Sequence, residues 1–162
     1  MAEKTAAVTY FALRKEIEQR KFRPIYLLQG EEPYYIDQLS DLIVNTALTD
    51  DTRDFNLSVF YGNDANVREV IATCKQYPTF AEHKVVVLRE AQLVAKQPGH
   101  KADLDLLKLY AERPLQSTIL VVCNKGGVLP TKALADALRK AGPDSGVVFT
   151  SAKVREGDRK SV

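Results

Sequence analysis

Short apolar runs alternate along this chain with longer segments in which apolar residues recur at helical spacing. The runs are rich in aliphatic and aromatic side chains and lie at residues 25–29, 55–61, 84–88, 118–123 and 146–150. The remaining segments carry apolar residues three and four positions apart, as amphipathic helices do, and cover residues 10–21, 33–48, 67–77, 104–109 and 131–141. This alternation predicts an α/β fold with a five-stranded, parallel, doubly wound sheet.

Prolines and glycines divide the pattern without creating a long linker. Pro24 ends the first predicted helix, Gly30 closes the first strand, and Pro78 stops the third helix. With 162 residues and no internal repeat, the chain suits one domain over residues 1–150. Residues 151–162 are rich in charge, and we expect them either to begin a connection to further domains or to form a frayed end.

Composition narrows the class of protein. The formal net charge of +2 comes entirely from residues 153–160, so acidic and basic residues are equal in number in the body of the chain. The body therefore lacks the strong positive charge that is typical of nucleic-acid-binding domains. The two cysteines belong to no metal-binding or disulfide pattern, which favours a reduced, intracellular protein. No apolar run approaches the ~20 residues that cross a bilayer, and the first residues lack the apolar region of a signal peptide. We therefore expect a cytoplasmic protein with no membrane partner, and the balanced charge gives no support for direct contact with DNA.

Ligands of a parallel α/β sheet bind beyond the carboxyl ends of its strands, so the residues after the first strand are informative. A P-loop would need a second glycine, a lysine and a hydroxyl residue there, and a dinucleotide site would need GxGxxG. The chain offers Gly30, Glu31, Glu32 and Pro33 instead. Two carboxylates would repel a polyphosphate, and proline lacks an amide donor. We therefore expect no bound nucleotide and no other cofactor.

Carboxylates at the strand ends leave one catalytic alternative open. Glu31, Glu32 and Glu90 are oxygen ligands that could hold Mg²⁺ and make this a metal-dependent phosphotransfer or nuclease domain. The competing interpretation is that these glutamates cap helices or face solvent, with no metal bound. A phospho-acceptor domain would need an aspartate at the end of the third strand, where the chain has Arg89.

Nucleophilic catalysis has no evident residues. His83 and His100 lie in predicted loops beside charged residues, and we interpret both as surface histidines. Cys74 is expected on the apolar face of a helix and Cys123 in the core. No catalytic residue is therefore predicted, and an α/β fold without its usual chemistry points to a binding role.

Three segments carry a family resemblance. Residues 24–32 (PIYLLQGEE) resemble the opening of the delta-subunit family of bacterial DNA polymerase III, the clamp-loader component that opens the sliding clamp. Residues 76–91 (QYPTFAEHKVVVLREA) look like the family segment in which a hydrophobic clamp-binding motif precedes a decayed Walker B motif, with Arg89 in place of the metal-binding aspartate. Residues 118–124 (TILVVCN) are similar to the sensor strand of AAA+ proteins. The likeness extends over the whole chain.

The resemblance implies a non-catalytic subunit of the DNA polymerase III holoenzyme, which acts in DNA replication. It implies an AAA+-like, P-loop-NTPase-like fold whose degenerate nucleotide site comprises Gly30, Glu31, Glu32, Arg89 and Glu90. The partner it implies is the sliding clamp, the beta subunit, which this protein would bind and help to open for loading onto primed DNA without hydrolysing ATP. Other loader subunits would be contacted through lid and collar domains that this chain lacks, and DNA only indirectly.

The same resemblance assigns clamp binding to Tyr77, Pro78, Thr79 and Phe80. Pro78 interrupts the preceding helix, so Thr79 and Phe80 would lie in a short connection from which an aromatic side chain can project. The residues alone favour Phe80 as a core residue that pins the loop, and only the family likeness reverses this interpretation. A third alternative is therefore an assembly scaffold in which Phe80 is buried.

Overall fold

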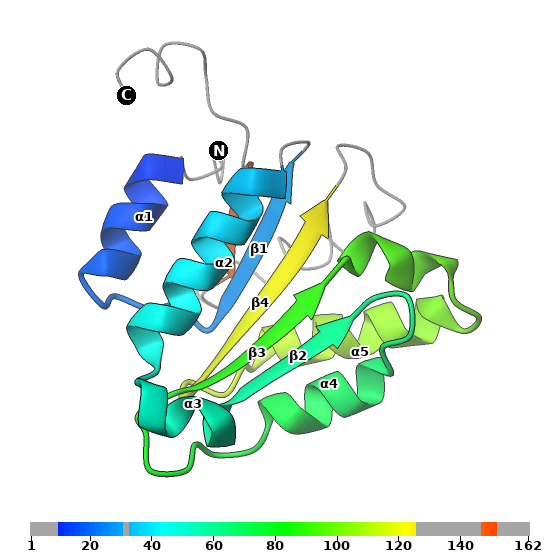
Figure 1. Cartoon of the computed structure of the whole chain (residues 1–162). Helices are drawn as coiled ribbons and strands as arrows, with labels where there is room; N and C mark the ends of the chain where they lie inside the picture. Colours follow the sequence, from blue (N-terminus) through cyan, green and yellow to red (C-terminus); the bar gives the residue numbers. More distant parts are fainter. Residues whose placement is uncertain (1–9, 31–32, 126–146, 152–162) are drawn as a thin grey trace, which may run out of the picture.

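The computed structural model describes residues 10–30, 33–125 and 147–151, and its centre is a parallel β-sheet (Figure 1). Four parallel strands form the body of the sheet, and a short fifth strand pairs with the far side of β1. From one edge of the sheet to the other, the order is β2 (Leu57–Tyr61), β3 (Lys84–Arg89), β4 (Thr118–Lys125), β1 (Ile25–Gly30) and β5 (Val147–Ser151). The predicted parallel α/β fold is confirmed.

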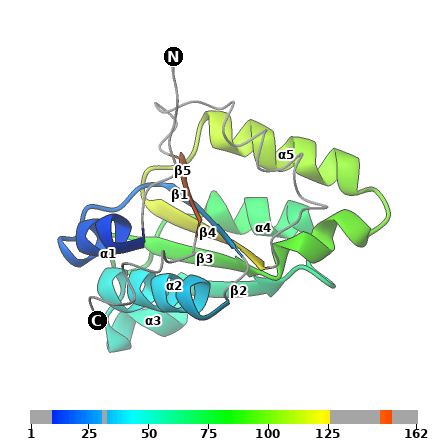
Figure 2. The ribbon, with the colours of Figure 1, turned by 90° about the horizontal axis from the view of Figure 1, so that it is seen from above.

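Helices cover both faces of the sheet, as Figure 2 shows from above. One face packs against α1 (Tyr10–Glu18) and α2 (Pro33–Ala47). The other packs against α4 (Val67–Cys74), the 3₁₀ helix η1 (Ala91–Lys96) and α5 (His100–Glu112).

Burial on both faces of the sheet explains why residues 85–88 of strand β3 are all apolar. Val85 and Val87 point into the core under α2, whereas Val86 and Leu88 point into the core under α4 and α5, and all four are fully buried. Side chains alternate between the two faces of a strand, so a strand covered on both faces needs apolar residues at every position.

The first residues of the predicted strand 55–61 are helical. Phe55 and Asn56 end the short helix α3 (Asp50–Asn56), and β2 begins only at Leu57. Thr49 and Thr52 bond reciprocally as a capping box, and two aspartates occupy the first turn of α3. These interactions stabilise a helix start, which overrides the strand preference of the residues that follow.

Other boundaries also differ from the prediction. Helix α1 ends at Glu18 because the chain turns at Arg20, whose φ is 60°. Helix α4 ends at Cys74, before Pro78 is reached. The predicted polar loop at residues 96–101 is shorter, since η1 and α5 take up both of its ends. The predicted helix 131–141 lies outside the described residues.

Gly62, after β2, is required by a close backbone contact. Its amide donates to the Arg89 carbonyl over 2.7 Å. A Cβ atom at this position would lie 2.0 Å from the carbonyl oxygen of Glu90. Only glycine therefore allows the turn after β2 to pack against the end of β3.

None of the helices within the described ranges has the length and apolar character needed to cross a bilayer.

Candidate functional site

The loop between α4 and β3 carries all four residues that the family resemblance assigns to clamp binding. Tyr77 is 73% exposed and Phe80 is 90% exposed, the highest value for a large hydrophobic side chain among the described residues. Thr79 is exposed and Pro78 is partly buried. The alternative in which Phe80 is a core residue is therefore wrong.

The backbone of this loop is held by a buried side chain from α3. The Oδ1 atom of Asn56 accepts a hydrogen bond from the Thr79 amide over 2.7 Å, and its Nδ2 atom donates to the Thr79 carbonyl over 2.8 Å. The Nδ2 atom also donates to the Thr52 carbonyl over 2.9 Å, and the Asn56 side chain is fully buried. Both backbone groups of Thr79 are thereby fixed, one residue before the exposed phenylalanine.

Phe80 itself has a left-handed backbone, with φ at 56°. A bulky side chain rarely adopts this conformation, which costs about 1–2 kcal/mol. The bonds from Asn56 to the preceding residue hold the chain in place next to this strained position. Phe80 therefore combines a strained backbone with an exposed side chain, and backbone strain of this kind clusters at functional sites.

A second set of contacts fixes the far end of the loop. Arg20 lies 3.7 Å from a carboxylate oxygen of Glu82 and also donates to the carbonyl of Thr46 at the end of α2. The ring of His83 packs edge-on against Phe22, with ring centroids 5.2 Å apart. The loop is thus anchored on both sides of Phe80, at Thr79 and at residues 82–83.

A surface hollow of about 280 Å³ lies beside Phe80. Its walls come from Arg20, from the end of α2 and the start of α3, and from Phe80, Ala81 and Glu82. An exposed aromatic side chain next to a hollow is a suitable geometry for an interlocking protein contact.

The opposite end of the sheet, at the carboxyl ends of β1, β3 and β4, holds a cluster of ion pairs. The Lys125 ammonium lies 3.1 Å from Asp37 and 3.5 Å from Glu90. Arg89 lies 3.7 Å from Asp37 and 3.8 Å from Asp41. The two cations and three carboxylates therefore satisfy one another at the place where related folds bind phosphates.

Lys125 is held in its charged form by this cluster. Burial alone would lower its pKa, but the hydrogen bond and charge of Asp37, with the charge of Glu90, raise the pKa above its ordinary value. Glu90 is further fixed by Gln92, which donates to it over 2.7 Å, and has a left-handed backbone with φ at 54°.

The magnesium alternative gains no support from the described residues. Of its three proposed ligands, Glu90 is engaged by Lys125 and Gln92, while Glu31 and Glu32 lie outside the described residues. Within the described ranges, no three histidine, cysteine or acidic side chains come together as a metal site. Gly30 ends β1 opposite Lys125 in the register of the sheet.

The histidine and cysteine predictions have mixed outcomes. Cys74 and Cys123 are buried, as predicted, and burial raises the pKa of their thiols to about 12 and about 11. His83 is not a plain surface histidine, because it is half-buried against Phe22 and burial lowers its pKa. His100 is the first residue of α5 rather than a loop residue.

Sequence reasoning missed Asn56 and Arg20, which position the loop. Asn56 was hidden because its segment was assigned to a strand. The preceding Thr-Asp-Asp-Thr sequence (residues 49–52), a helix-start signature, would have revealed α3 and placed Asn56 at its end. Arg20 gives no local signal, since its partners lie far away in the sequence.

These features describe a parallel α/β domain with ion pairs at the carboxyl ends of its strands and an exposed aromatic loop at the opposite end. Comparison with known families identifies the one to which it belongs. The model of the family "DNA polymerase III, delta subunit" matches residues 26–143. The chain belongs to this family, since the match covers well over half of its residues.

Individual relatives agree with this assignment. DNA polymerase III subunit delta of Bacillus subtilis (strain 168) is 26% identical over 134 residues, which are 80% of this chain and 39% of that protein. The chain thus spans well under half the length of this relative.

Two solved structures share the fold. The Bacillus subtilis DNA clamp loader delta protein (YqeN) matches with a TM-score of 0.78 and 23% identity, over 94% of this chain and 44% of its own. A DNA polymerase III gamma subunit-related protein from Thermotoga maritima matches with a TM-score of 0.58 and 12% identity, over 93% of this chain and 48% of its own.

Proposed function

We propose that this chain is the AAA+-like N-terminal domain of a clamp-loader delta subunit that binds the sliding clamp and promotes its opening without hydrolysing ATP. The contact surface is the loop of Tyr77, Pro78, Thr79 and Phe80. Contacts with the other loader subunits are made through the lid and collar domains of the family. Family membership supports the assignment to the loader, and the geometry of the loop supports the contact.

The observation that carries the proposal is the presentation of Phe80. A fully buried phenylalanine contributes roughly 1.5–3 kcal/mol relative to an exposed one, and Phe80 is 90% exposed, so nearly all of this remains to be gained on binding. Tyr77, at 73% exposure, offers a second anchor. The loop is already ordered by Asn56, so binding pays little conformational entropy at Thr79.

Opening of the clamp requires preferential binding to the open form. A partner shifts a conformational equilibrium only by the difference between its affinities for the two states. A rigidly held Phe80 and the adjacent hollow form a fixed shape that favours one geometry of the clamp surface.

The degenerate nucleotide site is the second part of the proposal. Arg89 stands where a metal-binding aspartate would be needed, and its guanidinium pairs with Asp37 and Asp41. Lys125 and Glu90 complete the cluster. Displacing these partners to admit a nucleotide and its metal would leave charged groups uncompensated, which supports a domain without ATPase chemistry.

The test is binding of the chain to its cognate sliding clamp in the absence of nucleotide. We expect Phe80→Ser to raise the Kd for the clamp by roughly 10- to 150-fold, which corresponds to the loss of about 1.5–3 kcal/mol, while circular dichroism and the urea midpoint stay unchanged. Leu109→Ser is the matched control, because Leu109 is 60% exposed and lies on α5. The proposal fails if wild type does not bind, or if Phe80→Ser and Leu109→Ser bind equally well.

A further inference from the structure

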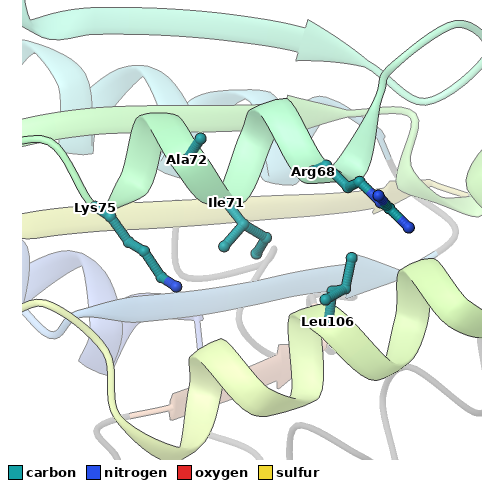
Figure 3. Close-up of a pocket in the computed structure, with 5 residues that line it drawn as sticks. All are labelled: Arg68, Ile71, Ala72, Lys75 and Leu106. Atoms are coloured by element: carbon teal, nitrogen blue, oxygen red, sulfur yellow. The ribbon is translucent and has the colours of Figure 1, made fainter.

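A groove between α4 and α5 is not used by the proposed clamp contact (Figure 3). Its volume is about 490 Å³, and its surface is mostly apolar. Ile71 of α4 and Leu106 of α5 point toward each other across it, and Ala72 adds a methyl group. The two remaining lining residues are Arg68 of α4 and Lys75, the residue directly after this helix.

The two cations stand at opposite ends of this groove, as Figure 3 shows. They are seven residues apart, and Lys75 keeps a helical backbone as the C-cap residue of α4, so the separation is about two turns, or about 10 Å along the axis. Both side chains are exposed, and within the described parts of the chain neither forms an ion pair or a side-chain hydrogen bond. The cluster at the strand ends, by contrast, pairs each of its cations with a carboxylate.

We propose that this groove binds an acidic amphipathic segment of a partner protein. The matching ligand has carboxylates about two helical turns apart and one or two large apolar side chains between them. The apolar side chains cover Ile71 and Leu106, and the carboxylates pair with Arg68 and Lys75. Charge complementarity and the apolar floor are the two features that select this ligand.

Nucleic acid fits the groove less well. Single strands bind to grooves that combine several cations with aromatic side chains on which bases stack. The groove has two cations, and none of its lining residues is aromatic.

A neighbouring hollow determines at which end of the groove the acidic segment stops. Arg68 also lines a polar hollow of about 450 Å³, together with Asp64 and Asp103. These two carboxylates would repel an acidic segment that continued beyond Arg68. The acidic segment therefore ends near Arg68, and its remaining carboxylates lie toward Lys75.

Selection of peptides by the 162-residue chain tests the proposal. We expect a random peptide display library to yield binders in which acidic residues flank apolar ones. Fluorescence anisotropy of the best labelled peptide should show a Kd raised at least about tenfold by Arg68→Glu/Lys75→Glu. A peptide with lysines in place of its acidic residues should bind this variant and not the wild type.

Control variants test whether the groove itself holds the peptide. Lys15→Glu/Lys21→Glu makes the same charge change in exposed residues of α1 and the turn after it, and should leave peptide binding unchanged. Arg68→Gln/Lys75→Gln serves if the charge-reversed variant does not fold. Phe80→Ser should retain peptide binding, since this inference does not rest on the clamp contact.

Three outcomes would overturn the proposal. One is a selection that enriches no peptide, or enriches peptides without acidic residues. Another is peptide binding that the groove and α1 variants affect equally. The third is displacement of the peptide by a single-stranded oligonucleotide whose own binding is lost in Arg68→Glu/Lys75→Glu, which would identify the groove as a nucleic-acid site.

Discussion

Replacing Asn56 tests whether the exposed loop is held in advance for its partner. Asn56→Ala removes three hydrogen bonds, two to the Thr79 backbone and one to the Thr52 carbonyl. Each such bond contributes about 0.5–1.5 kcal/mol, so the expected loss is roughly 3 kcal/mol if none is replaced. Thr79 is exposed, and water can satisfy part of its backbone, which brings the expected loss in unfolding free energy to about 2 kcal/mol.

The effect on binding has a separate origin. Without Asn56, Thr79 and Phe80 must be ordered when the partner binds, at a cost of about 1–2 kcal/mol of backbone entropy per residue. A total of about 2 kcal/mol corresponds to a roughly thirtyfold higher Kd for the sliding clamp. This loss occurs although Phe80 and Tyr77 are both still present.

Asn56→Asp is the matched variant. It keeps the shape and the acceptor for the Thr79 amide but loses the donor to two carbonyl groups and buries a charge. We expect it to be less stable than Asn56→Ala near pH 7 and to recover as the carboxyl is protonated at acid pH, because a protonated carboxyl can donate one of the lost bonds.

The assays are urea unfolding followed by circular dichroism, and titration of the sliding clamp by calorimetry. The reasoning is refuted if Asn56→Ala is folded and less stable but binds the clamp with unchanged affinity. The loop would then be positioned by Arg20 and Phe22 alone, or it would be ordered by the clamp itself.

Three further predictions concern the rest of the domain. Gly62→Ala places a Cβ atom 2.0 Å from the Glu90 carbonyl oxygen and should cost at least about 2 kcal/mol by urea unfolding, whereas Gly99→Ala, with a φ of 78° and open space, should cost about 1 kcal/mol. Burial lowers the pKa of His83 below its ordinary 6.5, so the contribution of His83 to stability is full above pH 6.5 and falls as the pH drops through the lowered value. In His83→Phe the urea midpoint should therefore fall less steeply as the pH is lowered. Asp37→Asn leaves Arg89 and Lys125 facing each other with fewer carboxylates and should destabilise by about 1–2 kcal/mol in low salt and by less in high salt, so an unchanged midpoint would contradict a stabilising role for the cluster.

The sheet was predictable because its strands obey one simple rule. Residues 85–88 of β3 and 119–123 of β4 are apolar at every position, and only a strand covered on both faces requires this. Strand β2 is at the edge of the sheet, where Val59 and Tyr61 are exposed. Its pattern is weaker for that reason, and its predicted start was wrong.

The candidate site was only partly predictable. The residues alone favoured Phe80 as part of the core, because a phenylalanine is more often buried than exposed. Its exposure depends on Asn56 and Arg20, which reach the loop from positions 23 and 62 residues away from Thr79 and Glu82. Side-chain contacts over such separations leave no local pattern in the sequence.

The two ends of the sheet seen in Figure 1 differ in how their polar and charged side chains are paired. At the carboxyl ends of the strands, Asp37, Glu90, Arg89 and Lys125 neutralise one another, so little remains there for a phosphate or a metal to satisfy. At the amino end of β3, a buried amide and an ion pair fix the backbone of the loop and leave Phe80 in solvent. The carboxyl ends of the strands are therefore held by ion pairs, whereas the opposite end exposes the aromatic side chain that the proposed clamp contact uses.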